Sequence, residues 1–460
     1  MLASIVENTN IYIEAISPNY QRSRDARPTN LPEIKALFGL LYLAGIHKSS
    51  RLNTEELWSR DGTGIDLFWL TMSLQRFRFL MRVIRTDNKN TREERCKKDK
   101  LAPIRDIFDS FVQNCQKSYT ICEYATVDEK LEAFRGRRSF RQYIPSKPNK
   151  YGIKIFALVD SKMYYTCNLE VYVGQQPEGE FRQSNDPKSV VLRLIMPITK
   201  TGRNITVDNW FTSYELINEL LEKHNLTLVG TMRKNKRQLP VEFVNTKQRP
   251  VNSSMFAFEK NKTLVSYVPR KGKNVILVSS MHFDDEIDTG TGDKAKPRII
   301  TFYNETKSGV DVVDELSSNY NCARITRRWP MVVLYSLLNI AGINSHIIFS
   351  SNNPSEDLIR RKFLMQLVRQ LVSDYQKHRA TQTNLPRQIR NRRQEAAGSS
   401  QEYRPRPEGR KRKRCEECVS DSKASYYCKK CFKYFCLSHA NIFCQQCEGV
   451  IDDDTMELSS

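Results

Sequence analysis

The sequence predicts a mixed α/β protein whose central sheet lies between two helical stretches. Three successive strand patterns suggest a meander, at residues 125–134, 152–160 and 164–174. The pattern then alternates helix, strand, helix and strand, at residues 190–196, 204–208, 213–224 and 226–232. This order is typical of the ribonuclease-H type of fold, in which the first and fourth strands lie side by side.

Helical patterns flank this central region on both sides. Four precede it, at residues 31–46, 54–58, 74–84 and 102–119. Two follow it, at residues 331–349 and 358–375. The last of these carries a regular apolar stripe. We expect the two C-terminal helices either to pack on the N-terminal helices or to form a dimer surface.

Residues 234–297 interrupt the α/β alternation. The segment is rich in turn residues and contains three short strand patterns, at residues 255–258, 263–268 and 274–279. We therefore predict a β-rich insertion here, followed by another strand at residues 298–303. The predicted parts are a helical region in two pieces, a sheet core in two pieces, the insertion, a linker and a cysteine-rich end. In chain order their bounds are 1–123 (helical), 124–234 (core), 235–297 (insertion), 298–320 (core), 321–386 (helical), 387–414 (linker) and 415–460 (cysteine-rich).

The chain of 460 residues is strongly basic. Its 73 Lys and Arg against 52 Asp and Glu give a net charge of +21, which favours a polyanionic partner, nucleic acid ahead of a membrane surface. The linker at 387–414 carries eleven basic residues against three acids and ends in GRKRKR, a composition that fits nuclear import and DNA affinity. The N-terminus lacks the layout of a signal peptide, and the uninterrupted apolar runs are short for a bilayer, so we expect an intracellular protein.

Four acids stand out because each follows a small apolar frame: Asp128, Asp208, Asp311 and Asp314. If Asp128 and Asp208 end neighbouring strands and Asp311 begins a helix beside them, the carboxylates converge. Asp314 lies three residues beyond Asp311, so both face the same side of a helix. Crowded carboxylates suit two Mg²⁺ or Mn²⁺ ions held by Asp128, Asp208 and Asp311, about 3.5–4 Å apart. Helix caps and ordinary strand-end acids are the open alternative.

A basic and aromatic run follows the first of these acids. The stretch from Lys130 to Lys154, counted with both ends, contains eight Lys or Arg and a single acid, with four aromatic residues interleaved. We expect Lys147 and Lys150 in this run to contact a phosphate chain. A solvated charged loop is the alternative.

The last 46 residues contain a dense group of soft metal ligands. Seven cysteines and one histidine form four close pairs, which fit two tetrahedral Zn²⁺ sites. In a cross-brace order, the first site is Cys415, Cys418, Cys436 and His439, and the second is Cys428, Cys431, Cys444 and Cys447. Sequential pairing remains open because spacing does not determine connectivity, and disulfides are the less favoured alternative. A glycine-rich phosphate-binding loop is missing, so the sequence does not support the use of an NTP.

Several long stretches resemble piggyBac-type transposases. They are VDEKLEAFRGRRSFRQYIPSKPNKYGIKIFALVDS at 127–161, NITVDNWFTS at 204–213, GVDVVDELSSNY at 309–320 and TRRWPMVVLYSLLNIAGINS at 326–345. The likeness covers almost the whole chain, and the motifs stand in the same order.

The resemblance implies a role for each predicted part. Asp128, Asp208 and Asp311 match the catalytic aspartates of a ribonuclease-H-like core, and Asp314 matches a nearby acid of that site. Trp329 matches a region that contacts transposon-end DNA, and we extend this expectation to Arg324, Arg327 and Arg328. The segment at 235–297 corresponds to an insertion domain. The flanking helices correspond to a dimerisation and DNA-binding domain, and the cysteine cluster to a cross-brace zinc domain that recognises terminal repeats.

The implied activity is cut-and-paste transposition at TTAA targets, by nicking, hairpin formation and strand transfer. Its partner is double-stranded DNA, both terminal inverted repeats and target, bound by a homodimer in the nucleus. Neither a membrane nor an NTP is expected. Two other functions are kept: a domesticated nuclear protein that binds DNA or chromatin without transposition, and an interaction protein that acts through its zinc module.

Overall fold

The structure is a computed structural model, which describes residues 1–145, 147–380, 413–419, 423–424, 426–427 and 433–439. The chain divides into two compact units, Met1–Thr383 and Asn384–Ser460. The predicted linker lies outside the described residues except for Lys413 and Arg414. The second predicted zinc site, Cys428, Cys431, Cys444 and Cys447, lies entirely outside them.

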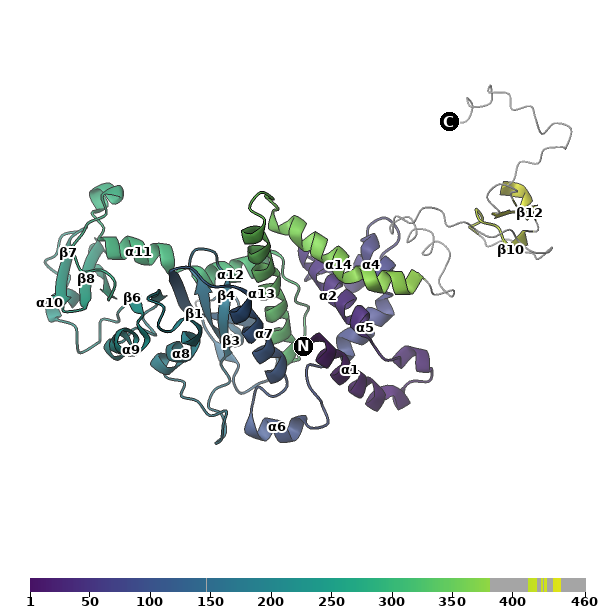
Figure 1. Ribbon diagram of the computed structural model, residues 1–460, viewed down its shortest axis with the longest axis horizontal. Coiled ribbons are helices and arrows are strands. Elements are labelled where there is room, and N and C mark those ends of the chain that lie inside the picture. Colours follow the sequence, from purple (N-terminus) through teal and green to yellow (C-terminus); the bar gives the residue numbers. More distant parts are fainter. Residues whose placement is uncertain (146, 381–412, 420–422, 425, 428–432, 440–460) are drawn as a thin grey trace, which may run out of the picture. The chain divides into compact units, whose positions relative to one another are not determined.

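Within the described residues, nine strands of the first unit form one mixed sheet (Figure 1). They are β1 (Tyr124–Ala133), β2 (Gln142–Tyr143), β3 (Tyr151–Asp160), β4 (Thr166–Val171), β5 (Asn204–Val207), β6 (Thr227–Thr231), β7 (Ser254–Glu259), β8 (Lys262–Arg270) and β9 (Lys273–Ser279). The order is β2-β3-β1-β5-β6-β9-β8-β7, and β4 also pairs with β3. The predicted meander β1, β3 and β4 is confirmed, as is the side-by-side position of the first and fourth predicted strands, β1 and β5, which pair in parallel.

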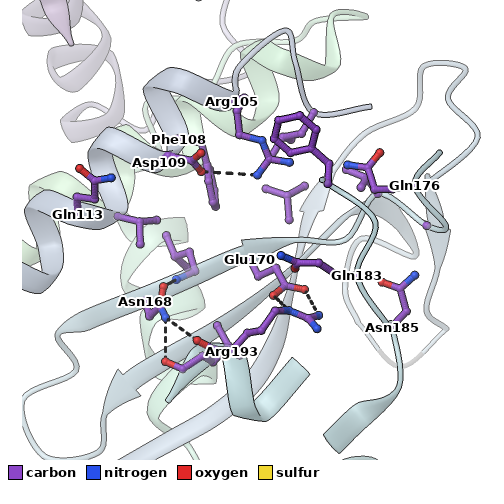
Figure 2. Close-up of a pocket in the computed structure, with 18 residues that line it drawn as sticks. Arg105, Phe108, Asp109, Gln113, Asn168, Glu170, Gln176, Gln183, Asn185 and Arg193 are labelled. Carbon is purple, nitrogen blue, oxygen red and sulfur yellow. Dashed lines mark hydrogen bonds and ion pairs between the residues drawn. The ribbon is translucent and has the colours of Figure 1, made fainter. Parts of the chain in front are cut away.

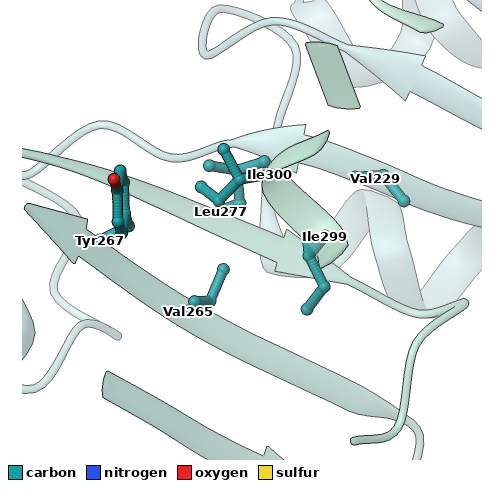
Figure 3. Packing of buried hydrophobic residues seen from close by; sticks show 6 residues of the cluster. All are labelled: Val229, Val265, Tyr267, Leu277, Ile299 and Ile300. Atoms are coloured by element: carbon teal, nitrogen blue, oxygen red, sulfur yellow. The ribbon is translucent and has the colours of Figure 1, made fainter. Parts of the chain in front are cut away.

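The β-rich segment after β6 continues the same sheet. Strand β9 pairs antiparallel with β6, and β8 and β7 follow it outward. One apolar cluster joins this segment to the core: Val229 of β6, Val265 and Tyr267 of β8, Leu277 of β9, and Ile299 and Ile300 (Figure 3). The insertion therefore shares a hydrophobic core with the sheet that it extends.

The strand predicted at 298–303 is wrong, because these residues belong to the helix α11 (Arg298–Thr306). The run Ile299, Ile300, Thr301 has high β-propensity, which suggested a strand. However, Ile299 and Ile300 recur with Phe302 and Tyr303 at the spacing of a helix face, and all four pack on the apolar cluster. Pro297 immediately precedes the helix. Tertiary packing outweighed the local preference.

The remaining helices cover the sheet or form the helical region. With the sheet lie α8 (Pro187–Leu194), α9 (Tyr214–His224), α10 (Val241–Val244) and α12 (Gly309–Asn319). The helical region contains α1 (Leu2–Ile16), α2 (Leu31–Ile46), α3 (Thr54–Leu57), α4 (Asp66–Thr71), α5 (Leu74–Val83), α6 (Arg92–Lys98), α7 (Arg105–Ser118), α13 (Trp329–Asn352) and α14 (Arg360–Ala380). The C-terminal helix α14 packs on α2 (Figure 1), where a Cβ on Gly39 would come 2.8 Å from Val372 Cγ1.

Helix α13 is, within the described residues, long and apolar enough by length and composition to cross a membrane. Its most apolar window is 67% buried inside the protein. The Tyr42 hydroxyl of α2 donates to the carbonyl of Leu338 at 2.5 Å, and Gly342 lies against Tyr42 and Leu364 of α14. Burial between α2, α14 and the sheet accounts for the apolar composition of this helix.

The second unit has short strands in its described part. Strand β10 (Lys413–Arg414) pairs with β11 (Lys423–Ala424), and β12 (Tyr426–Tyr427) pairs with β13 (Tyr434–Phe435). Its buried cluster consists of Cys415, Ala424 and Tyr434. Among the described residues of this unit the apolar cluster is small, and a small cluster of this kind is typical of domains that metal ligation stabilises.

Candidate active site and zinc site

Two predicted acids stand at matching positions of neighbouring parallel strands. Val127 of β1 is in register with Val207, the last residue of β5, so Asp128 on β1 and Asp208 directly after β5 are the next residues of the two segments. Asp128 Oδ1 accepts a hydrogen bond from the Glu129 amide, and Asp208 Oδ1 accepts one from the Trp210 amide, both at 2.8 Å. These backbone bonds orient the two carboxylates.

Threonine contacts bring α12 to the same place. The Thr126 hydroxyl donates to the carbonyl of Thr306 at 2.6 Å, and the hydroxyls of Thr206 and Thr306 lie 2.7 Å apart. At Gly309 a Cβ would come within 2.4 Å of Thr126 Oγ1, so a larger residue could not pack there. Gly309, the first residue of α12, therefore packs against Thr126, which lies two residues before Asp128 on β1. Asp311 follows Gly309 by two residues, so it lies beside the paired strands β1 and β5.

The acids share one electrostatic environment. Burial, with the nearby charges of Glu129 and Asp208, raises the pKa of Asp128 to about 8. Burial also raises the pKa of Asp208. Lys147 Nζ lies 3.1 Å from Asp311 Oδ1, and its charge also acts on Asp128 and Asp314. Lys147 therefore lies near Asp311, Asp128 and Asp314, and the side chain of Asp311 remains 64% exposed.

The donor set fits a hard divalent cation, because it consists of carboxylate oxygens whose charges the protein compensates incompletely. Among the described residues, only the cysteine–histidine group brings three or more ligand atoms within 4.8 Å of one another. The carboxylate oxygens of Asp128, Asp208 and Asp311 are therefore not all within 4.8 Å of one another. These side chains would have to move closer together to bind a shared ion. Metal binding by these three residues stays a prediction.

Asp314 lies on the inner side of α12 and pairs with a different lysine. Its Oδ1 is 3.4 Å from Lys130 Nζ, and burial raises the pKa of Asp314 despite that charge. The sequence did not single out Lys130. A signal was present, because Thr126, Asp128, Lys130 and Glu132 alternate along β1 and therefore share one face of the sheet.

The opposite face of the sheet carries another lysine near Asp208. Lys154 Nζ lies 4.5 Å from the ring centroids of both Phe156 and Trp210, and 3.8 Å from Glu129 Oε2. The Trp210 and Phe156 rings stack at 5.6 Å. Glu129 and Trp210 were also absent from the predicted site, although each is within two residues of a predicted acid.

Three residues expected to contact DNA make contacts inside the chain. Arg324 donates to the carbonyls of Ser49 and Leu52 at 2.6 and 2.9 Å. Arg328 donates to the carbonyls of Met81, Arg82 and Ile84, and burial lowers its pKa to about 10. Trp329 is buried against Phe140 and Arg138. Arg327 and Lys150 are exposed. DNA contact by these residues and Lys147 stays a prediction.

A cavity of about 340 Å³ lies between α7, β4 and the following loop (Figure 2). None of the predicted acids lines it. Its charged residues pair with one another, Glu170 with Arg193 at 2.7 Å and Arg105 with Asp109 at 3.6 Å. The cavity is therefore separate from the aspartates.

The first predicted zinc site is assembled in the second unit. Cys415, Cys418, Cys436 and His439 place one ligand atom each within 4.8 Å of the others. The Cys418 and Cys436 sulfurs lie 3.3 Å apart, and His439 Nδ1 lies 3.2 Å from Cys418 Sγ. The Ser438 hydroxyl and Cys418 lower the pKa of the Cys436 thiol to about 6, which favours the thiolate that zinc requires. This grouping is the one that a cross-brace order requires.

The chain resembles known transposases over most of its length. A family profile described as Transposase IS4 matches residues 1–346. Two human proteins, PiggyBac transposable element-derived protein 3 and Chimeric ERCC6-PGBD3 protein, are each 22% identical over 335 residues, or 66% of this chain. The matches cover 53% and 30% of those proteins, so the chain spans about half of their length or less.

A solved structure extends the match to nearly the whole chain. The cryo-EM structure of a piggyBac transposase synaptic complex with hairpin DNA is 38% identical, with a TM-score of 0.84. The match covers 97% of this chain and 94% of that one. With its mixed α/β sheet, its acids on parallel strands and its C-terminal zinc-ligand cluster, the chain belongs to the piggyBac-type family of DNA transposases.

Proposed function

We propose that this chain is an active DNA transposase that excises and inserts DNA at TTAA sites by metal-dependent phosphoryl transfer. The observation that carries the proposal is the register-matched pair Asp128 and Asp208 beside α12, in a chain of this family. Asp128, Asp208 and Asp311 would hold two Mg²⁺ or Mn²⁺ ions. Bound there, such ions stabilise the charge on the attacking and leaving oxygens of a phosphodiester.

The proposed reaction needs no external energy source. Water first attacks a phosphodiester at the transposon end, and the bond to the 3′ oxygen breaks, leaving a 3′-hydroxyl. That hydroxyl attacks the opposite strand, so one phosphodiester forms as another breaks and a hairpin closes. After hairpin opening, the same hydroxyl attacks target DNA. Each joining step conserves the number of phosphodiester bonds, which agrees with a protein that uses no NTP.

The chain's own residues would bind and orient the DNA. Lys147 and Lys150 stand in the basic run that follows Asp128, and Lys147 Nζ lies 3.1 Å from Asp311 Oδ1. Lys150 and Arg327 are exposed, and we assign all three residues to phosphate contacts. The solved relative is a synaptic complex with hairpin DNA, which supports DNA as the partner. A homodimer is our proposal for the working form. We assign the helical parts at 1–123 and 321–386 to dimerisation and DNA binding, and the GRKRKR linker to nuclear import.

The decisive experiment is a nicking assay on DNA that carries the element's own terminal repeats. The native protein with Mg²⁺ or Mn²⁺ is expected to give a nick and then a hairpin. Asp208→Ala should lower the rate at least about 10³-fold while it still binds the DNA. Asp186→Asn is the matched control, because Asp186 is an exposed N-cap of α8 and Asn can take that role. If the native protein binds these ends but leaves them uncut, the proposal is wrong.

A second function is a domesticated nuclear DNA-binding protein without transposition. The observation that favours it is that the two human relatives resemble the chain over 335 residues and one is named as element-derived. Under this function Asp208→Ala would leave the cellular effect of the protein unchanged. Under the first, the same substitution would remove it.

The zinc site has its own test. We assign Zn²⁺ to Cys415, Cys418, Cys436 and His439, and a second ion to Cys428, Cys431, Cys444 and Cys447. Elemental analysis of the purified chain should give two zinc ions, and Cys418→Ser should lower this to about one. Affinity for the terminal repeats should then fall, while nicking of DNA already bound should continue. A native protein without zinc would contradict the assignment.

A further inference from the structure

Strand β1 carries a buried lysine among its polar residues. Lys130 exposes 1% of its side chain, and lysines are almost never buried to this extent unless paired. It points to the same face of the sheet as Asp128, two residues earlier, and Glu132, two residues later. This is the face on which α12 packs, as the contact between Gly309 and Thr126 shows.

The ammonium group of Lys130 joins three elements. Its Nζ lies 2.9 Å from Glu132 Oε1 on β1 and 3.4 Å from Asp314 Oδ1 on α12. Glu132 Oε1 in turn accepts a hydrogen bond from the Ser336 hydroxyl of α13 at 2.6 Å. One buried charge therefore ties the helix that carries Asp311 and Asp314 to the sheet and to a core helix of the helical region.

We propose that Lys130 is a positioning residue for the aspartate site, because it holds Asp314, and with it α12, against β1 and α13. The inference rests on the proposed function, since it concerns the placement of the acids that would bind metal. A buried ammonium is tolerated only while both carboxylates remain close. That requirement restricts the rotation and sliding of α12, and Asp311 lies one helical turn from Asp314.

A second lysine at the site has a different environment. Lys147 pairs with Asp311, the more exposed acid, and keeps 18% of its own side chain exposed. Lys147 can therefore exchange Asp311 for a phosphate oxygen without leaving a buried charge unpaired. Lys130 has no comparable access to solvent, so moving away from Asp314 would leave its charge buried without that counter-charge. We therefore assign DNA contact to Lys147 and positioning of the acids to Lys130.

The test uses Tb³⁺, a hard cation whose luminescence is excited by a nearby tryptophan. Trp210 is suited to this because its amide donates to Asp208 Oδ1. The signal of the site is the part of the Tb³⁺ luminescence that is lost in Asp208→Ala. In Lys130→Met the Tb³⁺ dissociation constant should rise about tenfold or more, and the maximal nicking rate should fall about 10- to 100-fold, as for other groups that orient metal ligands.

The control separates positioning from general loss of stability. Arg76→Met breaks another buried ion pair, between Arg76 and Glu33 at 2.6 Å in the helical region. It should lower the melting temperature at least as much as Lys130→Met, yet keep the Tb³⁺ dissociation constant of the native protein. Lys130→Arg, which retains the charge, should recover Tb³⁺ affinity to within about threefold of native.

The possible outcomes distinguish the inference from the function on which it rests. If Lys130→Met binds Tb³⁺ and nicks DNA as the native protein does, the positioning role is wrong and the transposase proposal stands. If the native protein shows no signal that depends on Asp208, the metal site itself is wrong, and the role of Lys130 falls with it. Should Lys130→Met fail to fold, Glu132→Gln decides: at least a threefold loss of Tb³⁺ affinity supports the inference, and native affinity overturns it.

Discussion

Glu33 in the helical region and Asp128 on the sheet are carboxylates in opposite environments, the first buried and the second partly buried. Glu33 of α2 is 2% exposed and accepts hydrogen bonds from Arg76, Arg27, Thr29 and Tyr375. Asp128 of β1 has other acids as its neighbours. Four side chains donate to the first carboxylate, whereas the second accepts a hydrogen bond from the Glu129 amide and is close to the charges of Glu129, Asp208 and Lys147.

The pKa values express this difference. Burial alone would raise the pKa of Glu33, but the hydrogen bonds and charge of Arg76, with Tyr375 and Arg27, outweigh it and hold the pKa below the ordinary value. For Asp128, burial and the charge of Glu129 act in the same direction, and the pKa rises to about 8. A carboxylate whose partners offset the cost of burial stabilises the fold, and one whose pKa stays raised is a candidate for a functional site.

The largest expected effect on stability comes from Glu33. Glu33→Gln leaves Arg76 buried without its counter-charge, so the free energy of unfolding should fall by about 3 kcal/mol. Urea unfolding of the two proteins measures this difference. Glu55→Gln is the control, because its pair with Arg78 is exposed and should contribute less than about 1 kcal/mol. Equal losses in the two variants would mean that burial does not distinguish them.

Removal of the charge of Asp128 should have the opposite effect on stability. Asp128→Asn removes a carboxyl that folding forces toward its neutral form, so the metal-free protein should gain about 2 kcal/mol of stability at pH 7. The same variant should lose metal-dependent nicking. Thermal unfolding in EDTA, together with the nicking assay, measures both. A variant that is both inactive and less stable would show that Asp128 is a structural acid.

The two substitutions should also show opposite pH dependence, with changes of about 1–2 kcal/mol. The folded pKa of Glu33 is depressed below 4.5, so its contribution is present above pH 4.5 and is lost as the pH falls through the folded value. The cost of Glu33→Gln should shrink there. The folded pKa of Asp128 is raised, so the native protein loses stability as the pH rises from about 4 to about 8. The advantage of Asp128→Asn should grow over that range, as unfolding curves at several pH values would reveal.

Local patterns predicted the sheet and the positions of the acids well. The strands β1, β3, β4, β5 and β6 follow from the runs of apolar and β-branched residues, and the apolar frames before Asp128 and Asp208 reflect their places on the strands. The failure at α11 has the same origin, because a β-branched run is also compatible with a helix that packs against a core. Where local preference and tertiary packing favour the same conformation, local sequence patterns are sufficient to predict the secondary structure.

Local patterns could not predict side-chain contacts between residues that are distant in sequence. Lys130 meets Asp314 and, through Glu132, Ser336, residues that lie about 200 positions further along the chain. In the same way, Arg328 looked like a DNA contact because it stands in a basic loop, yet it donates to carbonyls at the end of α5. A charge pattern in the sequence shows that a charged residue is present, but the tertiary structure determines which group that residue pairs with.

The smallest expected effect tests whether a bound cation compensates the charge of Asp128. A cation bound at Asp128, Asp208 and Asp311 would supply the charge that the chain omits, so Mg²⁺ at about five times its dissociation constant should raise the unfolding free energy by about 1 kcal/mol. Asp128→Asn, already relieved of the buried charge, should show no such gain. Glu33→Gln should keep the full gain, because its carboxylate takes no part in the site. Differential scanning calorimetry with Mg²⁺ or EDTA measures all three, and a gain in Asp128→Asn would mean that the ions bind elsewhere. The comparison between the two carboxylates would then rest on pKa alone, without a functional difference behind it.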